Sequence, residues 1–101
     1  MSALRIERVD EGHARISGRL GFHEAASAAD RWRELATAGS EEIVADVRAL
    51  ENVDSATLAV LLEWAARVQA GSRRLRLVAA PAGLVALARL CDAESLLGLA
   101  G

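Results

Sequence analysis

The chain has 101 residues, of which 52% are hydrophobic and 26% charged, so it is long enough for one compact core and too apolar to be a disordered protein. Its formal net charge of −2 argues against a protein that grips the phosphate backbone of nucleic acids, because such proteins need a basic surface. No stretch resembles a signal peptide or approaches the roughly 20 apolar residues of a membrane span. We therefore expect a single domain over residues 1–101 that is cytoplasmic and does not insert into a membrane.

The N-terminal part of the chain predicts a β-hairpin followed by a helix. Leu4 and Ile6 alternate with charged residues, a turn follows at residues 10–12, and a second short strand continues through Ile16. The next segment has helical spacing and ends near Gly39, a good C-cap residue. A helix is therefore expected over residues 22–38, with an inner face formed by Phe22, Ala25, Ala26, Ala29, Trp32 and Ala36.

The segment from Ile43 onwards predicts a buried strand that leads into a helix. The nearly continuous apolar run from Ile43 to Val47 is typical of a central strand with helices on both faces of its sheet. Asp54 and Ser55 both have side-chain oxygens that can accept from the free amides of a first helical turn. A helix should therefore begin at Ser55 or one residue either side of it.

At 100° per residue, this helix has two contrasting faces. The core-facing stripe is predicted to contain Leu58, Leu61, Leu62, Ala65 and Val68. The opposite face begins with small residues and becomes charged in its second half. It is predicted to contain Ala56, Val60, Glu63 and Arg67, with Trp64 on its flank.

The C-terminal third predicts one more strand and two more helices. Leu75, Leu77 and Val78 form the strand, and Pro81 marks the first turn of a helix, where its missing amide costs nothing. Asp92 can cap a last short helix that extends through Leu97. The order β-β-α-β-α-β-α-α indicates an α/β fold with a four- to five-stranded mixed sheet and about four helices.

Neither a catalytic nor a metal site is predicted. The two candidate imidazole bases, His13 and His23, are both expected on the solvated surface, and capping explains the adjacent Asp54 and Ser55 without catalysis. The acidic pairs lack metal-ligand spacing, and a chain without lysine cannot contain a P-loop. Cys91 is expected to be buried and unreactive. We therefore expect no enzyme, no metal and no cofactor.

The segment ADVRALENVDSATLAVLL resembles the signature of STAS domains, the module of anti-sigma factor antagonists and sulfate transporters. Asp46, Asp54, Ser55 and Leu58 match the signature. The resemblance extends over nearly the whole chain, since the N-terminal hairpin and the closing strand and helices are similar too. It implies the STAS fold and a domain that works by binding another protein.

One departure from the STAS signature concerns regulation. In sporulation-type antagonists the phosphorylated serine is the second of a Ser-Ser pair, and Ala56 stands at that position in this chain. Without this hydroxyl a partner kinase cannot add the dianionic charge that breaks the complex. Ser55 and Thr57 remain candidate phosphoacceptors, but either would require a shifted register. The resemblance therefore favours constitutive binding over a phosphate-controlled switch.

The shorter segment VDSATLAVLLEW is similar to the STAS subunit of the Mla phospholipid transporter, the MlaB type. This resemblance implies a non-catalytic bacterial protein that binds and stabilises or regulates the ATPase subunit of a phospholipid-trafficking ABC transporter involved in outer-membrane lipid asymmetry. Such a protein would be peripheral to the inner membrane through its partner. The alternative is an anti-sigma factor antagonist, whose partner is an anti-sigma factor kinase.

The predicted partner-binding surface is the start and outer face of the second helix. Small residues there would let a partner helix approach closely, and an exposed Val60–Trp64 patch would favour a homodimer when the partner is absent. The residues predicted to bind the partner are Asp54, Ser55, Ala56, Thr57, Ala59, Val60, Glu63, Trp64 and Arg67.

Overall fold

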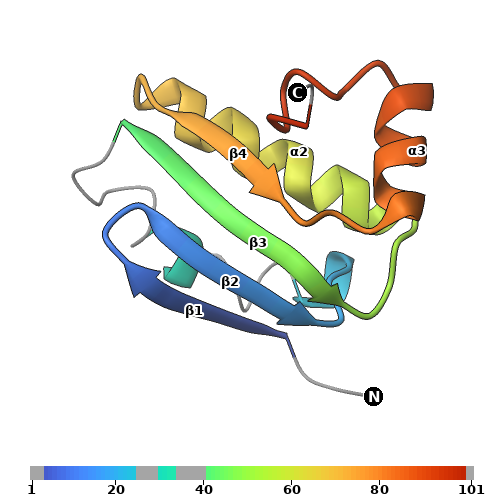
Figure 1. Ribbon diagram of the computed structural model, residues 1–101, viewed down its shortest axis with the longest axis horizontal. Coiled ribbons are helices and arrows are strands. Elements are labelled where there is room, and N and C mark those ends of the chain that lie inside the picture. Colours follow the sequence, from blue (N-terminus) through green and yellow to red (C-terminus); the bar gives the residue numbers. More distant parts are fainter. Residues whose placement is uncertain (1–3, 25–29, 34–40, 100–101) are drawn as a thin grey trace.

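Four strands form one mixed sheet in the computed structural model, which describes residues 4–24, 30–33 and 41–99 (Figure 1). The spatial order of the strands is the same as their order in the chain. The first two strands are antiparallel, and the remaining pairs are parallel. This confirms the predicted hairpin and mixed sheet. The strands are β1 (Arg5–Asp10), β2 (His13–Gly18), β3 (Glu42–Leu50) and β4 (Arg74–Val78).

Helices connect the parallel strands, as predicted. Helix α2 (Ser55–Ala70) joins β3 to β4, and α3 (Ala82–Leu90) follows β4. Residues 22–24 and 30–33 are helical, in agreement with the helix predicted over residues 22–38. The rest of that prediction, including Ala25, Ala26, Ala29, Ala36 and Gly39, lies outside the described residues.

The two aromatic residues of this first helix have different environments. Trp32 is buried in the core, as predicted. The predicted core position of Phe22 is wrong, because its side chain is 68% exposed. Leu20, two residues earlier, is fully buried and takes the place in the core instead.

Among the described residues, the helices cover one face of the sheet. Along β3 the buried residues Ile43, Ala45 and Val47 alternate with half-buried ones. In Figure 1 the strands lie in front and α2 lies behind them. For the part of the chain that the structure describes, the expectation that helices cover both faces is therefore wrong. The short apolar run fits this strand because Val44 is tolerated on the open face, where Glu42 and Asp46 flank it.

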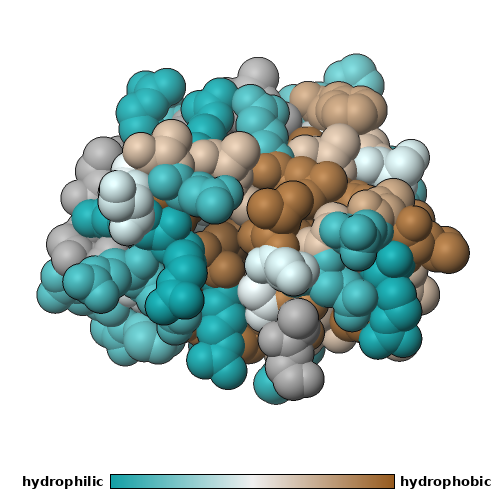
Figure 2. Space-filling view, turned by 90° about the horizontal axis from the view of Figure 1, so that it is seen from above, coloured by the Kyte–Doolittle hydropathy of each residue, from teal (hydrophilic) through white to brown (hydrophobic). Residues whose placement is uncertain are grey.

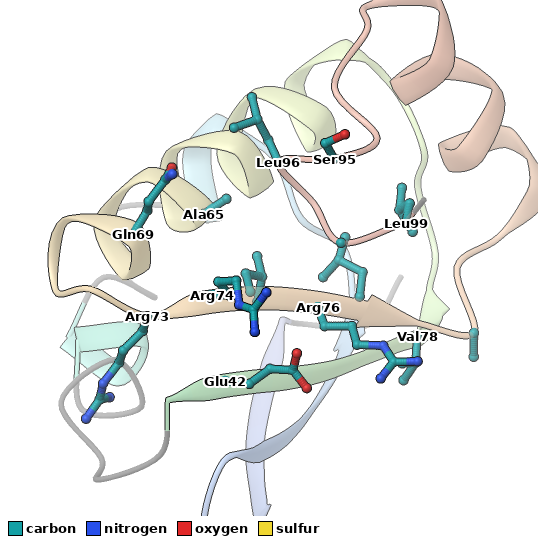
Figure 3. Close-up of a pocket in the computed structure, with 14 residues that line it drawn as sticks. Glu42, Ala65, Gln69, Arg73, Arg74, Arg76, Val78, Ser95, Leu96 and Leu99 are labelled. Carbon is teal, nitrogen blue, oxygen red and sulfur yellow. The ribbon is translucent and has the colours of Figure 1, made fainter. Parts of the chain in front are cut away.

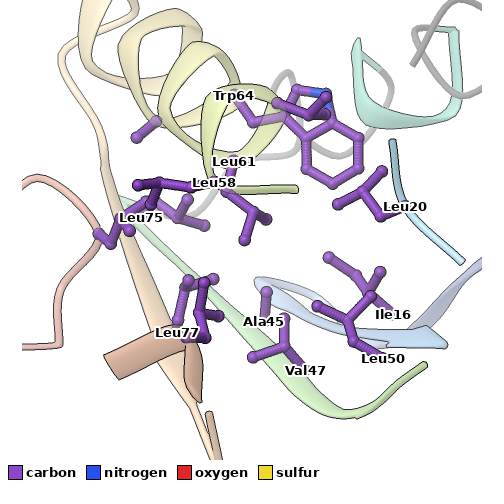
Figure 4. Packing of buried hydrophobic residues seen from close by; sticks show 14 of the residues in the cluster. Ile16, Leu20, Ala45, Val47, Leu50, Leu58, Leu61, Trp64, Leu75 and Leu77 are labelled. Atoms are coloured by element: carbon purple, nitrogen blue, oxygen red, sulfur yellow. The ribbon is translucent and has the colours of Figure 1, made fainter. Parts of the chain in front are cut away.

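The core lies between the buried face of the sheet and α2. Figure 4 shows side chains of α2 gathered above those of β3 and β4, with Ile16 of β2 and Leu50 at the end of β3 beside them. The α2 side chains buried in this core are Thr57, Leu58, Val60, Leu61, Trp64, Ala65 and Val68.

The chain after α3 runs back along the outer edge of β4. The backbone N–H of Leu77 donates to the Leu97 carbonyl at 3.0 Å. Residues 94–98, where a last short helix was predicted, form successive turns. Gly98 has a φ of 66°, and a Cβ there would lie 2.6 Å from the Leu75 carbonyl oxygen. Only glycine therefore lets the segment approach β4 this closely.

The end of α3 differs from the prediction for Cys91. This thiol is exposed, not buried. Helix α3 ends at Leu90, which is itself 84% exposed, and Asp92 then adopts a left-handed conformation with a φ of 55°. Cys91 thus lies in a turn at the surface rather than on the inner face of the helix.

Candidate partner-binding site at the start of helix α2

A buried hydroxyl fixes the start of α2. Thr57 is completely buried although it is polar. Its Oγ1 donates to the Leu20 carbonyl at 2.8 Å and accepts from Asn52 Nδ2 at 2.8 Å. A buried hydroxyl is tolerated when it has such partners, and here they come from two different segments of the chain. The first turn of α2 is therefore tied to the loop that follows β2.

Asn52 completes this connection. Its Oδ1 accepts from the backbone N–H of Leu20 at 2.7 Å, and its Nδ2 donates to the Leu20 carbonyl at 2.8 Å. The side-chain amide thus pairs with both backbone groups of one residue 32 positions earlier. Asn52 did not stand out in the sequence, because an asparagine in a loop before a helix cap has no local signature of a long-range contact.

Asp54 is the N-cap of α2, as predicted. Its Oδ1 accepts from the backbone N–H of Thr57 at 3.0 Å, and the Asp54 backbone N–H lies 3.4 Å from Thr57 Oγ1, which makes a reciprocal capping box. The hydrogen bond from the Thr57 backbone and a further one from Asn52 lower the pKa of the Asp54 carboxyl below its ordinary value of 3.8. The cap is therefore charged at neutral pH.

The exposed surface of α2 begins directly after this cap. Ser55 and Ala59 are exposed, Ala56 is half-buried, and the charged pair Glu63 and Arg67 follows further along the helix. Arg67 Nη2 lies 2.9 Å from Glu63 Oε1. The outer face is thus small and uncharged in its first half and charged in its second, as the sequence predicted.

Three residues predicted for the partner-binding surface are buried instead. Thr57, Val60 and Trp64 are 0%, 2% and 3% exposed. The ring of Trp64 stacks on that of Trp32, with centroids 4.5 Å apart and an angle of 16° between the rings. Helix α2 is turned further toward this tryptophan than its leucine spacing suggested, and Leu62 is consequently only half-buried.

Two further expectations change with this burial. The Val60–Trp64 patch that was expected to favour a homodimer is not exposed. Thr57 has its hydroxyl enclosed and hydrogen-bonded, so it does not offer a phosphoacceptor in this structure. Ser55 is the remaining candidate, with its side chain on the surface.

Among the described residues, neither histidine makes a hydrogen bond with Ser55. His13 opens β2, where its Nδ1 lies 2.6 Å from Asp10 Oδ1. Since β2 and β3 are parallel and Ser55 follows the far end of β3, His13 and Ser55 lie at opposite ends of the sheet. His23 is exposed.

The part of the chain that the structure describes was also searched for grouped metal ligands and for membrane-spanning helices. No three histidine, cysteine or carboxylate side chains there are grouped so that they could hold a metal ion. None of the helices there has the length and hydrophobicity needed to cross a membrane.

Comparison with known families and structures agrees with this architecture. Residues 5–98 match the family model described as "Mlab, STAS domain". No curated protein matches the chain by sequence at a significant level.

Nineteen chains of known structure are similar to this one. They include the Bacillus cell fate determinant SpoIIAA in its phosphorylated form, with a TM-score of 0.68 and 16% identity over 93% of this chain and 87% of that one. The anti-sigma factor antagonist SpoIIAA in its unphosphorylated form has a TM-score of 0.65 and 18% identity, over 87% and 83% of the two chains. A protein described as Mglu has a TM-score of 0.58 and 22% identity over 79% of this chain and 20% of its own. These likenesses show a shared fold.

Proposed function

The chain belongs to the MlaB-type STAS domain family, and from this premise we propose that it binds and stabilises or regulates the ATPase subunit of a phospholipid-trafficking ABC transporter. STAS domains are generally non-catalytic modules that act through protein–protein interactions. We accordingly propose that this protein is not an enzyme. It would lie on the cytoplasmic side of the inner membrane, held there by its partner.

This proposal is supported above all by the start of α2, which is exposed, has small side chains and is firmly anchored. Asn52 and Thr57 fix the first turn from below, so the exposed Ser55 and Ala59 are presented on a rigid element. A partner that binds a rigid surface loses less conformational entropy than one that must first order it. The exposed alanine side chain leaves room for close approach of a partner helix.

The polar groups around this surface would orient the partner. The Ser55 hydroxyl can donate or accept at the N-terminal rim, and the Asp54 carboxylate is charged beside it. Glu63 and Arg67 bring one charge of each sign at the other end. We propose Asp54, Ser55, Ala56, Ala59, Glu63 and Arg67 as the partner-binding residues, without the buried Thr57, Val60 and Trp64.

The test is capture of the ATPase from the native host by two separate variants. Each variant carries an Ala→Arg substitution at one exposed helix position. Ala59→Arg puts a long charged side chain on the proposed surface, whereas Ala86→Arg makes the same change on the exposed side of α3. We expect Ala59→Arg to abolish co-purification and Ala86→Arg to leave it unchanged. Ser55→Arg should weaken capture as well. Equal capture by both alanine variants would refute the proposed surface.

A second candidate function is that of an anti-sigma factor antagonist. The same exposed Ser55 favours it, because a phosphate at the start of a helix is stabilised by free backbone amides and the helix dipole. Ala56, which has no hydroxyl, argues for constitutive binding instead.

Incubation with a cognate serine kinase separates the two functions. Mass spectrometry that finds phosphate on Ser55, together with recovery of an anti-sigma factor and no ATPase, would establish the antagonist in place of the transporter subunit. We expect the ATPase and no phosphate. The variant Ser55→Ala identifies the modified residue, since it must abolish any such signal.

A further inference from the structure

A groove of about 700 Å³ follows the outer edge of β4, away from the start of α2. It is bounded by β4, the second half of α2 and the segment that runs back after α3. Figure 3 shows Gln69, Ala65 and Leu96 on one side of the strand and Glu42 on the other. The volume lies in the range of about 300–1,000 Å³ that is typical of small-ligand sites.

One wall of the groove is rich in arginine. Arg73, Arg74 and Arg76 line it, together with a single acidic residue, Glu42. Arg74 and Arg76 have exposed side chains, and neither makes an ion pair with any of the described residues. Three guanidinium groups against one carboxylate give this wall a positive charge, although the whole chain has a formal charge of −2.

The other wall is apolar. Ala65 from α2 and Leu96 and Leu99 from the C-terminal segment line it. Leu96 is 53% exposed. Figure 2 shows that the face with α3 and the C-terminal segment has hydrophobic surface near its centre, flanked by hydrophilic side chains. Leu96 and the arginines thus line one groove from opposite sides of β4, and a ligand with both an apolar and an anionic part could contact both.

We propose that this groove binds an amphiphile with an anionic head and a single apolar chain. The head would lie against Arg74 and Arg76, because a guanidinium group can donate two parallel hydrogen bonds to a phosphate or carboxylate. The chain would lie over Ala65 and Leu96. Nothing in this proposal depends on the ATPase, since the groove contains none of the residues proposed for partner binding.

The test is calorimetric titration of the full chain with monomeric ligands that differ in one part each. Oleoyl lysophosphatidic acid has the anionic head and the chain, oleoyl lysophosphatidylcholine has the chain with a zwitterionic head, and inorganic phosphate has the head alone. We expect lysophosphatidic acid to bind about tenfold or more tightly than either of the others, the gain of one charge-assisted hydrogen bond or more. Oleate, which has a carboxylate head on the same chain, should bind as well.

Paired variants connect this binding to the groove. The double variant Arg74→Gln, Arg76→Gln should lose about tenfold or more in affinity for lysophosphatidic acid. The control Arg5→Gln, an exposed arginine at the opposite edge of the sheet, should bind like the wild type. Leu96→Ala should weaken both lysolipids to a similar degree. All these side chains are exposed, so thermal unfolding should show intact variants.

Several results would overturn the proposal. Equal affinity for the two lysolipids would contradict the proposed role of the arginines. If phosphate bound as tightly as lysophosphatidic acid, the apolar wall would have no role in binding. Binding to anionic bilayer vesicles but to no monomeric lysolipid would indicate a membrane-surface site instead. The double arginine variant should still capture the ATPase, so that failure here is distinguishable from failure of the proposed function.

Discussion

At its first turn helix α2 is held by hydrogen bonds, whereas at its middle it is held by stacked aromatic rings. The first anchor joins Thr57 and Asn52 to the backbone of Leu20. The second stacks Trp64 on Trp32. Both attach the same helix to segments that lie more than 30 positions earlier in the chain.

The two anchors differ in what they contribute. Apolar stacking removes a large area from water and is insensitive to small displacements, so it should supply most of the stability. Hydrogen bonds contribute less net free energy but require a particular geometry. The polar anchor should therefore determine where the Ser55 end of the helix lies, while the aromatic anchor determines whether the helix stays attached.

The largest effect should come from the aromatic anchor. Trp64→Ala removes a nearly fully buried ring and leaves a cavity beside Trp32, so it should lower the free energy of unfolding by about 3–5 kcal/mol. Urea denaturation followed by circular dichroism measures this. Leu90→Ala, at an 84% exposed apolar residue, serves as control and should change stability by less than about 0.5 kcal/mol. Similar losses for both would mean that the stacking contributes little.

The polar anchor should give the next largest effect. Thr57→Val keeps the shape of the side chain but deprives Asn52 and the Leu20 carbonyl of a hydrogen-bonding partner, which should cost about 1–3 kcal/mol. Thr57→Ser retains the hydroxyl and should lose much less. Amide hydrogen exchange in the first turn of α2 should increase in the valine variant. A valine variant as stable as the serine variant would contradict the structural role of this hydroxyl.

How much of the site could be predicted from the sequence depends on how far apart in the chain the partners in these anchors lie. Local signals were sufficient for the start of α2, because Asp54 caps a backbone amide only three residues away and such an acceptor stabilises the free amides of a first helical turn. They were insufficient for Thr57 and Trp64, whose partners Leu20 and Trp32 come from distant segments.

The same distinction applies to the fold. The order of strands and helices follows from apolar spacing and turn residues, which are local. The single covered face of the sheet in the described residues could not be predicted in this way, because a short run such as Ile43 to Val47 fits a strand with one or both faces covered. The groove beside β4 was also missed, since Arg74 and Leu96 come to line the same groove only after the chain turns back past α3.

A smaller effect, with a pH dependence, is expected at the cap that borders the polar anchor. Asp54→Ala removes the acceptor for the Thr57 N–H and should cost about 1 kcal/mol at neutral pH. The pKa of Asp54 is lowered in the folded state, so the carboxylate stabilises the fold above its ordinary value of 3.8. This contribution is lost as the pH falls below 3.8 through the lower folded-state pKa.

Comparison with an uncharged cap tests this pH dependence. Asp54→Asn can still accept the hydrogen bond but does not titrate, so the advantage of the wild type over this variant should disappear as the pH falls from neutral to values below 3.8. Urea denaturation at several pH values measures the difference. A constant difference over this range would mean that the Asp54 charge is not coupled to folding.

The smallest effect on stability should come from the outer face of α2, which neither anchor touches. Glu63 and Arg67 form an exposed pair at 2.9 Å, and such pairs four residues apart on a helix contribute only about 0.3–0.5 kcal/mol. The double variant Glu63→Ala, Arg67→Ala should therefore unfold almost like the wild type. If these side chains orient the ATPase, the same variant should capture it less well, and the loss should shrink at high salt because exposed charges are screened. Weak capture with full stability would separate binding from folding on one helix, whereas full capture would confine the partner surface to the Ser55 end.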